Sequence, residues 1–345
     1  MSIQKTGNVF FKPWAKRRAP RKILAMRFQA MGDLVITLPY LQGLKNSLPD
    51  TKLHLLTRRE VSSIPKNLFL FDRVIEIGGG RNAKLQFVLC LLLIPYLWWQ
   101  RYDVVLDLQN HKISRVVRFL LFPVCWSQFD RSSANAAGYR TKKTIEAAHI
   151  CKFEISTAYG VRKKFDVNSI LRKGGWDDKG DLVILNPAGA FVTRNWPLEN
   201  YLIFANAWIE KVNANTFFIM LGLDSMKEKS AFLKKHLGEK LIDLVMKTTS
   251  IEAFLIAQKA KFVLSEDSGL MHMAWVQGVP TLALFGSSRG DWSAPLGTWS
   301  KCLNSADLSC RYCLKEICQY GDVRCLHRYT PEFVLSEALE LISRN

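Results

Sequence analysis

The sequence lacks the short glycine and aspartate motifs that identify many nucleotide-using proteins. It contains no G-x-G-x-x-G pattern, which forms dinucleotide-binding loops, and no Walker A pattern, which cradles nucleoside triphosphates. It also contains no D-x-D pair of the kind that holds a metal-bound sugar nucleotide. The sequence therefore gives no sign of an NAD-dependent oxidoreductase, a P-loop hydrolase or a D-x-D metal site.

A hydrophobic run long enough to span a bilayer is also missing. The longest run, FVLCLLLIPYLWW at Phe87–Trp99, is too short to span and contains Pro95. It predicts a buried core helix or, because it ends in Trp98 and Trp99 and basic residues surround it, a segment half-sunk in a membrane interface. No signal-peptide core follows the basic residues 1–22, so we expect the protein to stay in the cytoplasm.

Acidic residues are scarce in the first half of the chain. Residues 1–173 carry 30 Lys and Arg against 11 Asp and Glu, a net charge of +19, whereas residues 174–345 carry 18 against 19, a net charge of −1. The first half therefore accounts for the whole basic excess in the formal charge of +18. This field attracts nucleic acid, an anionic membrane or an acidic substrate. No basic segment is interleaved with stacking aromatics, so we expect no nucleic acid partner. Residues 1–22 hold seven basic residues and no acid, which predicts a mobile basic arm.

The chain is long enough for two domains, expected at residues 23–173 and 174–345 and joined by a polar linker at 172–175. In both, short apolar runs alternate with helical segments, which is typical of a parallel sheet covered by helices on both faces. The predicted fold class is therefore α/β, with two Rossmann-like domains. The expected strands are Lys22–Phe28, Lys52–Thr57, Arg73–Ile77, Asp103–Leu108, Asp181–Leu185, Thr216–Leu221, Leu241–Leu244, Phe262–Leu264 and Thr281–Phe285.

The first strand leads into a candidate acid–base site. Gly32 permits a tight turn after the strand, before a helix predicted over Leu34–Asn46. Pro39 predicts that this helix kinks or begins late. Asp33 then lies at the opening of the helix, where a carboxylate can cap the helix or act as a general base toward a hydroxyl.

The most informative stretch is Lys261–Ser288, which predicts one strand–helix–strand unit. Its strand-to-helix loop holds Asp267, Ser268 and Gly269, and His272 follows about one turn later. Ligands of open α/β sheets collect at such loops, and anions favour a helix N-terminus. A plain helix cap and a packed histidine explain the same pattern. The loops that contain Gly189, Gly222 and Gly286 are expected to ring the same mouth.

The last forty residues are rich in cysteine. Cys310, Cys313, Cys318 and Cys325 form C-x2-C-x4-C-x6-C, but only the first pair has the spacing preferred by structural zinc. A zinc site and simply packed thiols both fit this spacing, and our prediction for the functional site includes no metal. Because no secretory signal precedes them, the thiols are expected to be reduced.

Four segments together resemble glycosyltransferase family 9, the family of ADP-heptose:lipopolysaccharide heptosyltransferases. They are ILAMRFQAMGDLVITLP at Ile23–Pro39, NPAGAFVTRNWP at Asn186–Pro197, SEDSGLMHMAWVQGVPTLALFG at Ser265–Gly286, and CRYCLKEICQYGDVRCLHRYTPEFV at Cys310–Val334. The resemblance implies a GT-B fold, in which two Rossmann-like domains face each other across a cleft. It places the acceptor on the N-terminal domain and the nucleotide-sugar on the C-terminal one.

The resemblance also implies an inverting transfer that needs neither metal nor cofactor. Asp33 matches the carboxylate of the family's R-x-x-x-x-G-D motif and is implied as the general base, with Gly32 supporting its turn. The loop from Asp267 to His272 matches the family's D-[ST]-G-x-x-H, which holds the donor's phosphates and sugar. Arg194 stands where members often carry Lys. The residues expected to bind the donor are Asn186, Gly189, Arg194, Gly222, Thr249, Asp267, Ser268, Gly269 and His272.

The expected reaction moves a heptose from ADP-heptose to an acidic lipid-linked saccharide, the Kdo/heptose–lipid A inner core of lipopolysaccharide. The basic first half suits such an acceptor and an anionic inner-membrane surface, so we expect a cytoplasmic protein bound peripherally to that membrane. One alternative is a family 9 enzyme with another nucleotide-sugar or acceptor. Another is a non-catalytic membrane-surface protein of the same fold.

Overall fold

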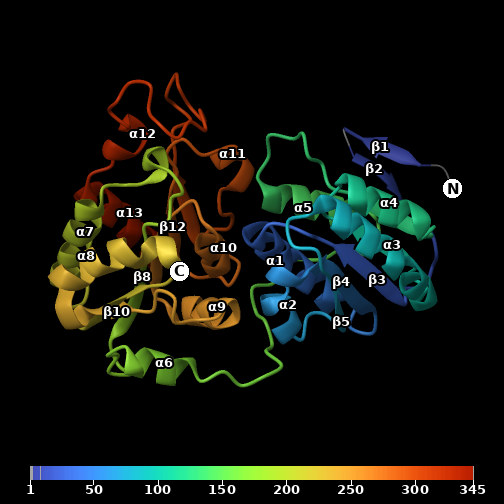
Figure 1. Cartoon of the computed structure of the whole chain (residues 1–345), viewed down its shortest axis with the longest axis horizontal. Coiled ribbons are helices and arrows are strands. Elements are labelled where there is room, and N and C mark those ends of the chain that lie inside the picture. Colours follow the sequence, from blue (N-terminus) through green and yellow to red (C-terminus); the bar gives the residue numbers. More distant parts are fainter. Residues whose placement is uncertain (1–2, 8, 345) are drawn as a thin grey trace. The chain divides into compact units, whose positions relative to one another are not determined.

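The computed structural model describes residues 3–7 and 9–344. The chain folds into two compact units, Met1–Lys163 and Lys164–Asn345 (Figure 1). Each unit is a sheet with helices packed on both faces, so the α/β class and the two Rossmann-like units are confirmed.

The first unit is built on a seven-stranded sheet of order β1-β2-β7-β6-β3-β4-β5. Strands β3 to β7 run parallel, as the alternation of apolar runs and helices predicts. The strands are β1 (Gln4–Thr6), β2 (Val9–Lys12), β3 (Lys22–Met26), β4 (Lys52–Arg58), β5 (Arg73–Ile77), β6 (Val104–Asp107) and β7 (Cys125–Gln128). The helices are α1 (Met31–Ser47), the 3-10 helix η1 (Arg59–Val61), α2 (Ser63–Asn67), α3 (Ala83–Gln100), α4 (Lys112–Leu120) and α5 (Ala137–Ala147).

The N-terminal segment differs from the predicted mobile arm. In its described part, β1 and β2 form an antiparallel hairpin, and β2 pairs with β7 through Phe11 and Ser127. Phe11 and Trp14 are buried, and the Trp14 backbone N–H donates to the Ala148 carbonyl at 2.8 Å. Burial of these two aromatic side chains fixes the segment at the sheet edge despite its positive charge.

Helix α1 begins at Met31 and continues through Pro39 to Ser47, so the expectation of a late start is wrong. Because the helix starts before Gly32, this glycine lies in the first helical turn and not in the turn that follows β3. Asp33 is the third helical residue.

The second unit is an all-parallel sheet of order β10-β9-β8-β11-β12-β13. It begins before the predicted linker, because Val167 and Leu171 of α6 are buried in its core. The strands are β8 (Asp181–Asn186), β9 (Thr216–Met220), β10 (Leu241–Asp243), β11 (Phe262–Glu266), β12 (Thr281–Leu284) and β13 (Ser300–Leu303). The helices are α6 (Val167–Lys173), η2 (Val192–Arg194), α7 (Leu198–Lys211), η3 (Asp224–Met226), α8 (Lys227–Leu237), η4 (Gly238–Lys240), α9 (Ser250–Lys259), α10 (Gly269–Trp275), α11 (Gly290–Ser293), α12 (Arg324–His327) and α13 (Pro331–Ser343).

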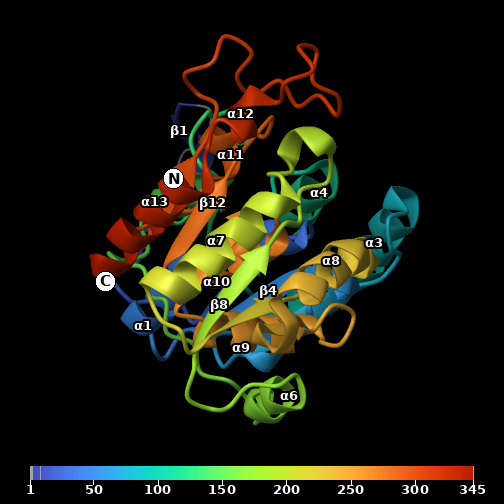
Figure 2. The same cartoon turned by 90° about the vertical axis from the view of Figure 1, so that its left-hand side faces the viewer.

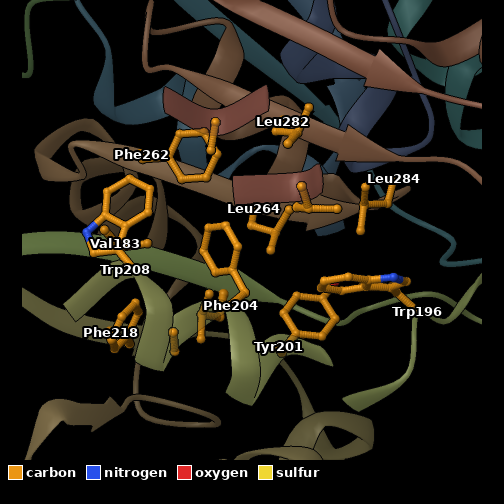
Figure 3. Close-up of a cluster of buried hydrophobic side chains, with 14 of the residues drawn as sticks. Val183, Trp196, Tyr201, Phe204, Trp208, Phe218, Phe262, Leu264, Leu282 and Leu284 are labelled. Carbon is orange, nitrogen blue, oxygen red and sulfur yellow. The ribbon is translucent and has the colours of Figure 1, made fainter. Parts of the chain in front are cut away.

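The larger core of the second unit lies between its sheet and the helices α7, α8 and α13, and Figure 2 shows α7 and α13 alongside one another. Aromatic rings fill this layer. Phe204 and Trp208 of α7 stack on Phe262 of β11, while Trp196 meets Tyr201 edge to face (Figure 3). Trp196 immediately follows the loop that carries Arg194, so this core anchors one side of the candidate site.

Candidate functional site

The two candidate clusters lie at corresponding points of the two sheets. In the first sheet the strand order reverses between β3 and β6, and in the second it reverses between β8 and β11. Ligands of open α/β sheets bind at the carboxyl ends of strands at such a switch point. Asp33 follows β3, and the Asp267–Gly269 loop follows β11. Asp33 in the first unit and the Asp267–Gly269 loop in the second therefore lie where the topology of each sheet favours a ligand.

In the first unit, Asp33 is held by two groups on one side of its carboxylate. Oδ2 lies 2.9 Å from Nη2 of Arg27 and accepts the Ala30 backbone N–H at 3.0 Å. Arg27 is buried, whereas the Asp33 side chain is 42% exposed. Oδ2 of the carboxylate is therefore held in place while the side chain remains open to a ligand. A general base needs this arrangement.

A hydrogen-bonded loop after β6 supports this turn, and its residues were not predicted. Oε1 of Gln109 accepts the backbone N–H groups of Phe28 and Gln29 at 3.1 and 3.3 Å. The buried Asp107 accepts the N–H of Asn110 at 2.7 Å and pairs with Arg118 at 2.9 Å. The partners of Gln109 lie 81 and 80 residues away in the sequence, whereas Asp107 and Arg118 are 11 residues apart, and no sequence motif marks either interaction.

A basic cavity of about 600 Å³ opens beside the loops that follow β6 and β7. It is lined by Asn110 and by two arginines, Arg115 and Arg131, with Asp130 as the acidic residue of the lining. Nε of Arg115 donates to the side-chain oxygen of Asn110 at 2.7 Å, which orients its guanidinium. Guanidinium groups bind carboxylates and phosphates through paired N–H donors. The remaining lining residues are Phe10, Gln128 and Ser132.

In the second unit, the ends of β8 and β11 are joined by side-chain hydrogen bonds. The Asn186 amide donates to Oγ of Ser265 at 2.7 Å and to Oγ of Ser268 at 2.6 Å. Ser268 is also the cap of α10, because its hydroxyl accepts the Met271 N–H at 3.3 Å. A methyl group added at Gly269 would meet no atom within 4 Å, so the backbone at this helix start is open to close approach.

Arg194 and Asp267 bring the two loops of this cluster together. Nη1 of Arg194 lies 3.8 Å from Oδ2 of Asp267, and both side chains are about one-fifth exposed. The guanidinium rests 5.1 Å from the centre of the Phe191 ring. Its Nε is buried and has no hydrogen-bond partner within the part of the chain that the structure describes. A buried donor without an acceptor destabilises the folded protein. A bound anion that accepts this hydrogen bond removes the destabilisation.

Glu266 holds the Arg194 loop to β11, and sequence analysis missed it. Its carboxylate accepts the Gly189 N–H at 2.6 Å and the Trp196 N–H at 2.7 Å. A Cβ added at Gly189 would lie 2.2 Å from the Arg194 carbonyl oxygen, so the loop needs glycine there for packing. Burial raises the pKa of Glu266 to about 7, although the two backbone donors and the Lys229 charge act in the opposite direction.

This pKa predicts a pH dependence of stability. Between pH 4.5, the ordinary pKa, and about 7, the folded chain keeps a proton on Glu266 that the unfolded chain has already lost. Rising pH therefore favours unfolding, and we expect Glu266 to lower the free energy of unfolding by about 3 kcal/mol across this range. Urea titrations of the wild type and Glu266→Gln at several pH values measure this change in the free energy of unfolding.

Subtracting the free energy of unfolding of Glu266→Gln from that of the wild type at each pH separates the contribution of Glu266 from that of other titrating groups. Glu266→Gln is expected to lose this part of the pH slope, whereas Glu199→Gln, at an exposed position on α7, should keep it. Equal slopes in the wild type and Glu266→Gln would show that Glu266 does not titrate in this range.

His272 is nearly buried on α10 and is part of the protein's own hydrogen-bond network. Its Nδ1 accepts the indole N–H of Trp275 at 2.9 Å, so the proton of the neutral ring is on Nε2. Trp275 is itself buried. The structure therefore fixes the orientation of the imidazole.

Gly222 and Thr249 follow β9 and β10, farther along the sheet edge from the β8–β11 switch point. Gly222 has a φ of +146°, and a Cβ there would lie 2.6 Å from Met226. Thr249 caps α9, and its hydroxyl and backbone N–H both bind Glu252. Within the residues the structure covers, no hydrogen bond or ion pair links either one to the Asn186–Arg194–Asp267 cluster.

The four C-terminal cysteines all line one small cavity next to Thr193 and Ser287. All eight cysteines are free thiols. Burial, followed by the nearby Cys313, Cys318 and Cys310 sulfurs, raises the pKa of Cys325 to about 11. Across residues 3–7 and 9–344, no group of three or more His, Cys, Asp or Glu side chains is placed to hold a metal ion.

Comparisons with known proteins relate this chain to a family of glycosyltransferases. The sequence model of "Glycosyltransferase family 9 (heptosyltransferase)" matches residues 93–324. Lipopolysaccharide heptosyltransferase 1 of Pseudomonas aeruginosa is 21% identical over 87% of this chain and 88% of its own length. Lipooligosaccharide heptosyltransferase 2 of Campylobacter jejuni is 29% identical over 53% of this chain. That match covers 56% of the relative, so the chain spans little more than half of it.

Two solved structures share the fold. A glycosyltransferase family 9 protein from Veillonella parvula superposes with a TM-score of 0.75 over 94% of this chain and 98% of its own, at 16% identity. The ADP-heptose lipopolysaccharide heptosyltransferase II of E. coli superposes with a TM-score of 0.68 over 94% and 99%, also at 16% identity. These matches confirm the GT-B fold class. With the family match over two-thirds of the sequence, they show that the chain belongs to glycosyltransferase family 9, the heptosyltransferase family.

Proposed function

We propose that this chain is an inverting glycosyltransferase that moves a heptose from ADP-heptose to the Kdo/heptose–lipid A inner core of lipopolysaccharide. Family membership and the names of the relatives support the donor and the acceptor class. The proposal depends on one observation at the β8–β11 switch point. There, the buried Nε of Arg194 has no hydrogen-bond acceptor among the described residues. A diphosphate supplies such an acceptor.

In the proposed reaction, Asp33 takes the proton of an acceptor hydroxyl, and the hydroxyl oxygen attacks the anomeric carbon of the donor sugar. The bond from that carbon to the β-phosphate oxygen breaks, and ADP leaves with the bonding electrons. The configuration at the carbon inverts because this is one in-line displacement. Arg194 and the backbone N–H groups that begin α10 stabilise the charge on the departing diphosphate. We propose that no metal or cofactor takes part, as the family resemblance implies.

The basic cavity of the first unit suits the proposed acceptor. Arg115 and Arg131 can pair with the carboxylates of Kdo or with phosphates of the inner core. Because such an acceptor is anchored in lipid, we propose that the protein works in the cytoplasm, bound peripherally to the inner membrane. The basic excess of the first unit supports that location.

The test is transfer from ADP-heptose to a truncated Kdo-lipid acceptor, with the product's anomeric configuration determined by NMR. We expect a heptosylated product of inverted configuration. Transfer of heptose with retained configuration would refute the mechanism. Thermal stabilisation by a different nucleotide-sugar, with none by ADP-heptose, would instead favour the alternative family 9 activity on another donor.

A further inference from the structure

Helix α3 is apolar on all sides, yet only one side of it is covered. The run Phe87–Trp99 is too short to span a bilayer, but the whole helix, Ala83–Gln100, is long and apolar enough to cross one by length and composition alone, and 28% of it is buried. Cys90, Ile94 and Leu97 form the buried side, which packs into the first unit's core with β-strand residues such as Leu56 and Val105. Since this side belongs to the folded core, we treat α3 as part of the unit and not as a membrane span.

The opposite side of α3 exposes large apolar side chains in one stripe. Leu85, Val88, Leu92 and Trp99 share this side by helical spacing. Leu92 and Trp99 are 71% and 77% exposed. Surface leucines and tryptophans that occur singly need no explanation, but a stripe of four does.

Helix α4 extends the stripe into a continuous surface. It packs alongside α3 (Figure 1), and the indole N–H of Trp98 donates to the Leu120 carbonyl at 2.7 Å. Phe119 and Phe122 flank Leu120, touch each other at 5.9 Å between ring centres, and are 71% and 72% exposed. We call this surface the α3–α4 face. It comprises Leu85, Val88, Leu91, Leu92, Trp98, Trp99, Phe119, Phe122 and Val124.

The charged residues on α3, on α4 and in the loops that flank them are all basic, and Asp103 and Asp107 of the intervening strand segment are each paired with an arginine. Residues 78–102 and 108–129, which contain both helices and their flanking loops, include six Lys and Arg and no Asp or Glu. A second copy of the chain would bring the same positive charges against this face and be repelled. An anionic bilayer offers apolar depth for the aromatics and negative headgroups for the basic rim. The basic rim consists of Arg81, Lys84, Arg101, Lys112 and Arg115, whereas the sixth basic residue, Arg118, is paired with the buried Asp107.

We propose that the α3–α4 face is the surface by which this protein docks on an anionic lipid bilayer, with the stripe at the headgroup–acyl boundary and the basic rim on the headgroups. The inference rests on the proposed function in one respect, because a lipid-anchored acceptor gives the docking its purpose. Docking would bring the first unit, which carries Asp33 and the basic cavity, to the surface that displays this acceptor.

The experiment measures co-sedimentation with vesicles of phosphatidylethanolamine and phosphatidylglycerol, and with vesicles of phosphatidylcholine alone. Leu92→Gln/Trp99→Gln is expected to weaken binding to the anionic vesicles by about tenfold or more, because two large apolar side chains no longer enter the lipid. Ile203→Gln/Ile317→Gln, which changes two exposed apolar residues of the second unit, is the matched control and should bind like the wild type.

The charge contribution is tested separately. Lys84→Gln/Lys112→Gln should weaken binding to the anionic vesicles by about tenfold or more, because each basic residue near such a surface strengthens binding by about fivefold. Added salt should screen this contribution. The same pair should leave the weak binding to phosphatidylcholine unchanged. Circular dichroism of each variant confirms that the fold is retained.

Two results would overturn the inference. One is anionic-vesicle binding by Leu92→Gln/Trp99→Gln as tight as that of the wild type. The other is a wild-type dimer, seen by light scattering, that this double variant dissociates. Failure of the proposed function is distinguishable, because it would appear as absent heptose transfer to a lipid-free acceptor while vesicle binding still depended on the α3–α4 face.

Discussion

Replacing Asp33 by Asn is expected to lower the rate of sugar transfer by about 10²–10⁴-fold, the range that a positioned general base contributes. Asn keeps the size of the side chain and can still accept from the Ala30 N–H, so the start of α1 should persist. It cannot take the acceptor's proton. Single-turnover transfer measures the chemical step, and calorimetric titration with ADP measures donor binding, which should change little.

Asp50→Asn is the matched control, because it removes an exposed carboxylate from the loop that follows α1. It should transfer at the wild-type rate. A rate for Asp33→Asn within a few-fold of wild type would show that the base is another group. A loss of ADP affinity in Asp33→Asn would show a structural effect and not a chemical one.

Much of the second unit was predictable because its signals are local. The strand β11, the helix α10 and the strand β12 occur where the apolar runs and the Ser268 cap predict them. Helix α9 begins directly after Thr249, whose side chain accepts the Glu252 N–H and caps the helix. Each depends on residues within a few positions of one another, so one sequence suffices to find them.

The supporting groups of both clusters could not be predicted, because their partners are remote in sequence. Glu266 binds backbone groups 77 and 70 residues away, and Gln109 binds groups 81 and 80 residues away. Nothing local distinguishes Glu266 from an ordinary strand-end carboxylate. The N-terminal hairpin was missed for the same reason, since β2 gains its partner from β7.

The second large effect is expected for Arg194→Ala, which should lower kcat/KM by about 10²–10³-fold and raise the Kd for ADP by about tenfold or more. The substitution removes a positive charge and the buried Nε donor from the β8–β11 switch point. The loss in kcat/KM should exceed the loss in ADP affinity, because negative charge on the diphosphate grows as the sugar bond breaks. Steady-state transfer kinetics and calorimetry on the same preparations give both numbers.

Arg194→Lys separates charge from geometry. Lysine keeps the positive charge but has neither the Nε donor nor the planar group that rests on Phe191, so it should recover ADP affinity more fully than turnover. Arg172→Ala, at an exposed arginine of α6 that pairs with Asp178, should behave like the wild type. If Arg194 served only to hold Asp267, Arg194→Ala would lower thermal stability and leave the Kd for ADP unchanged. That outcome would show that the donor's diphosphate does not bind at the switch point of the second sheet.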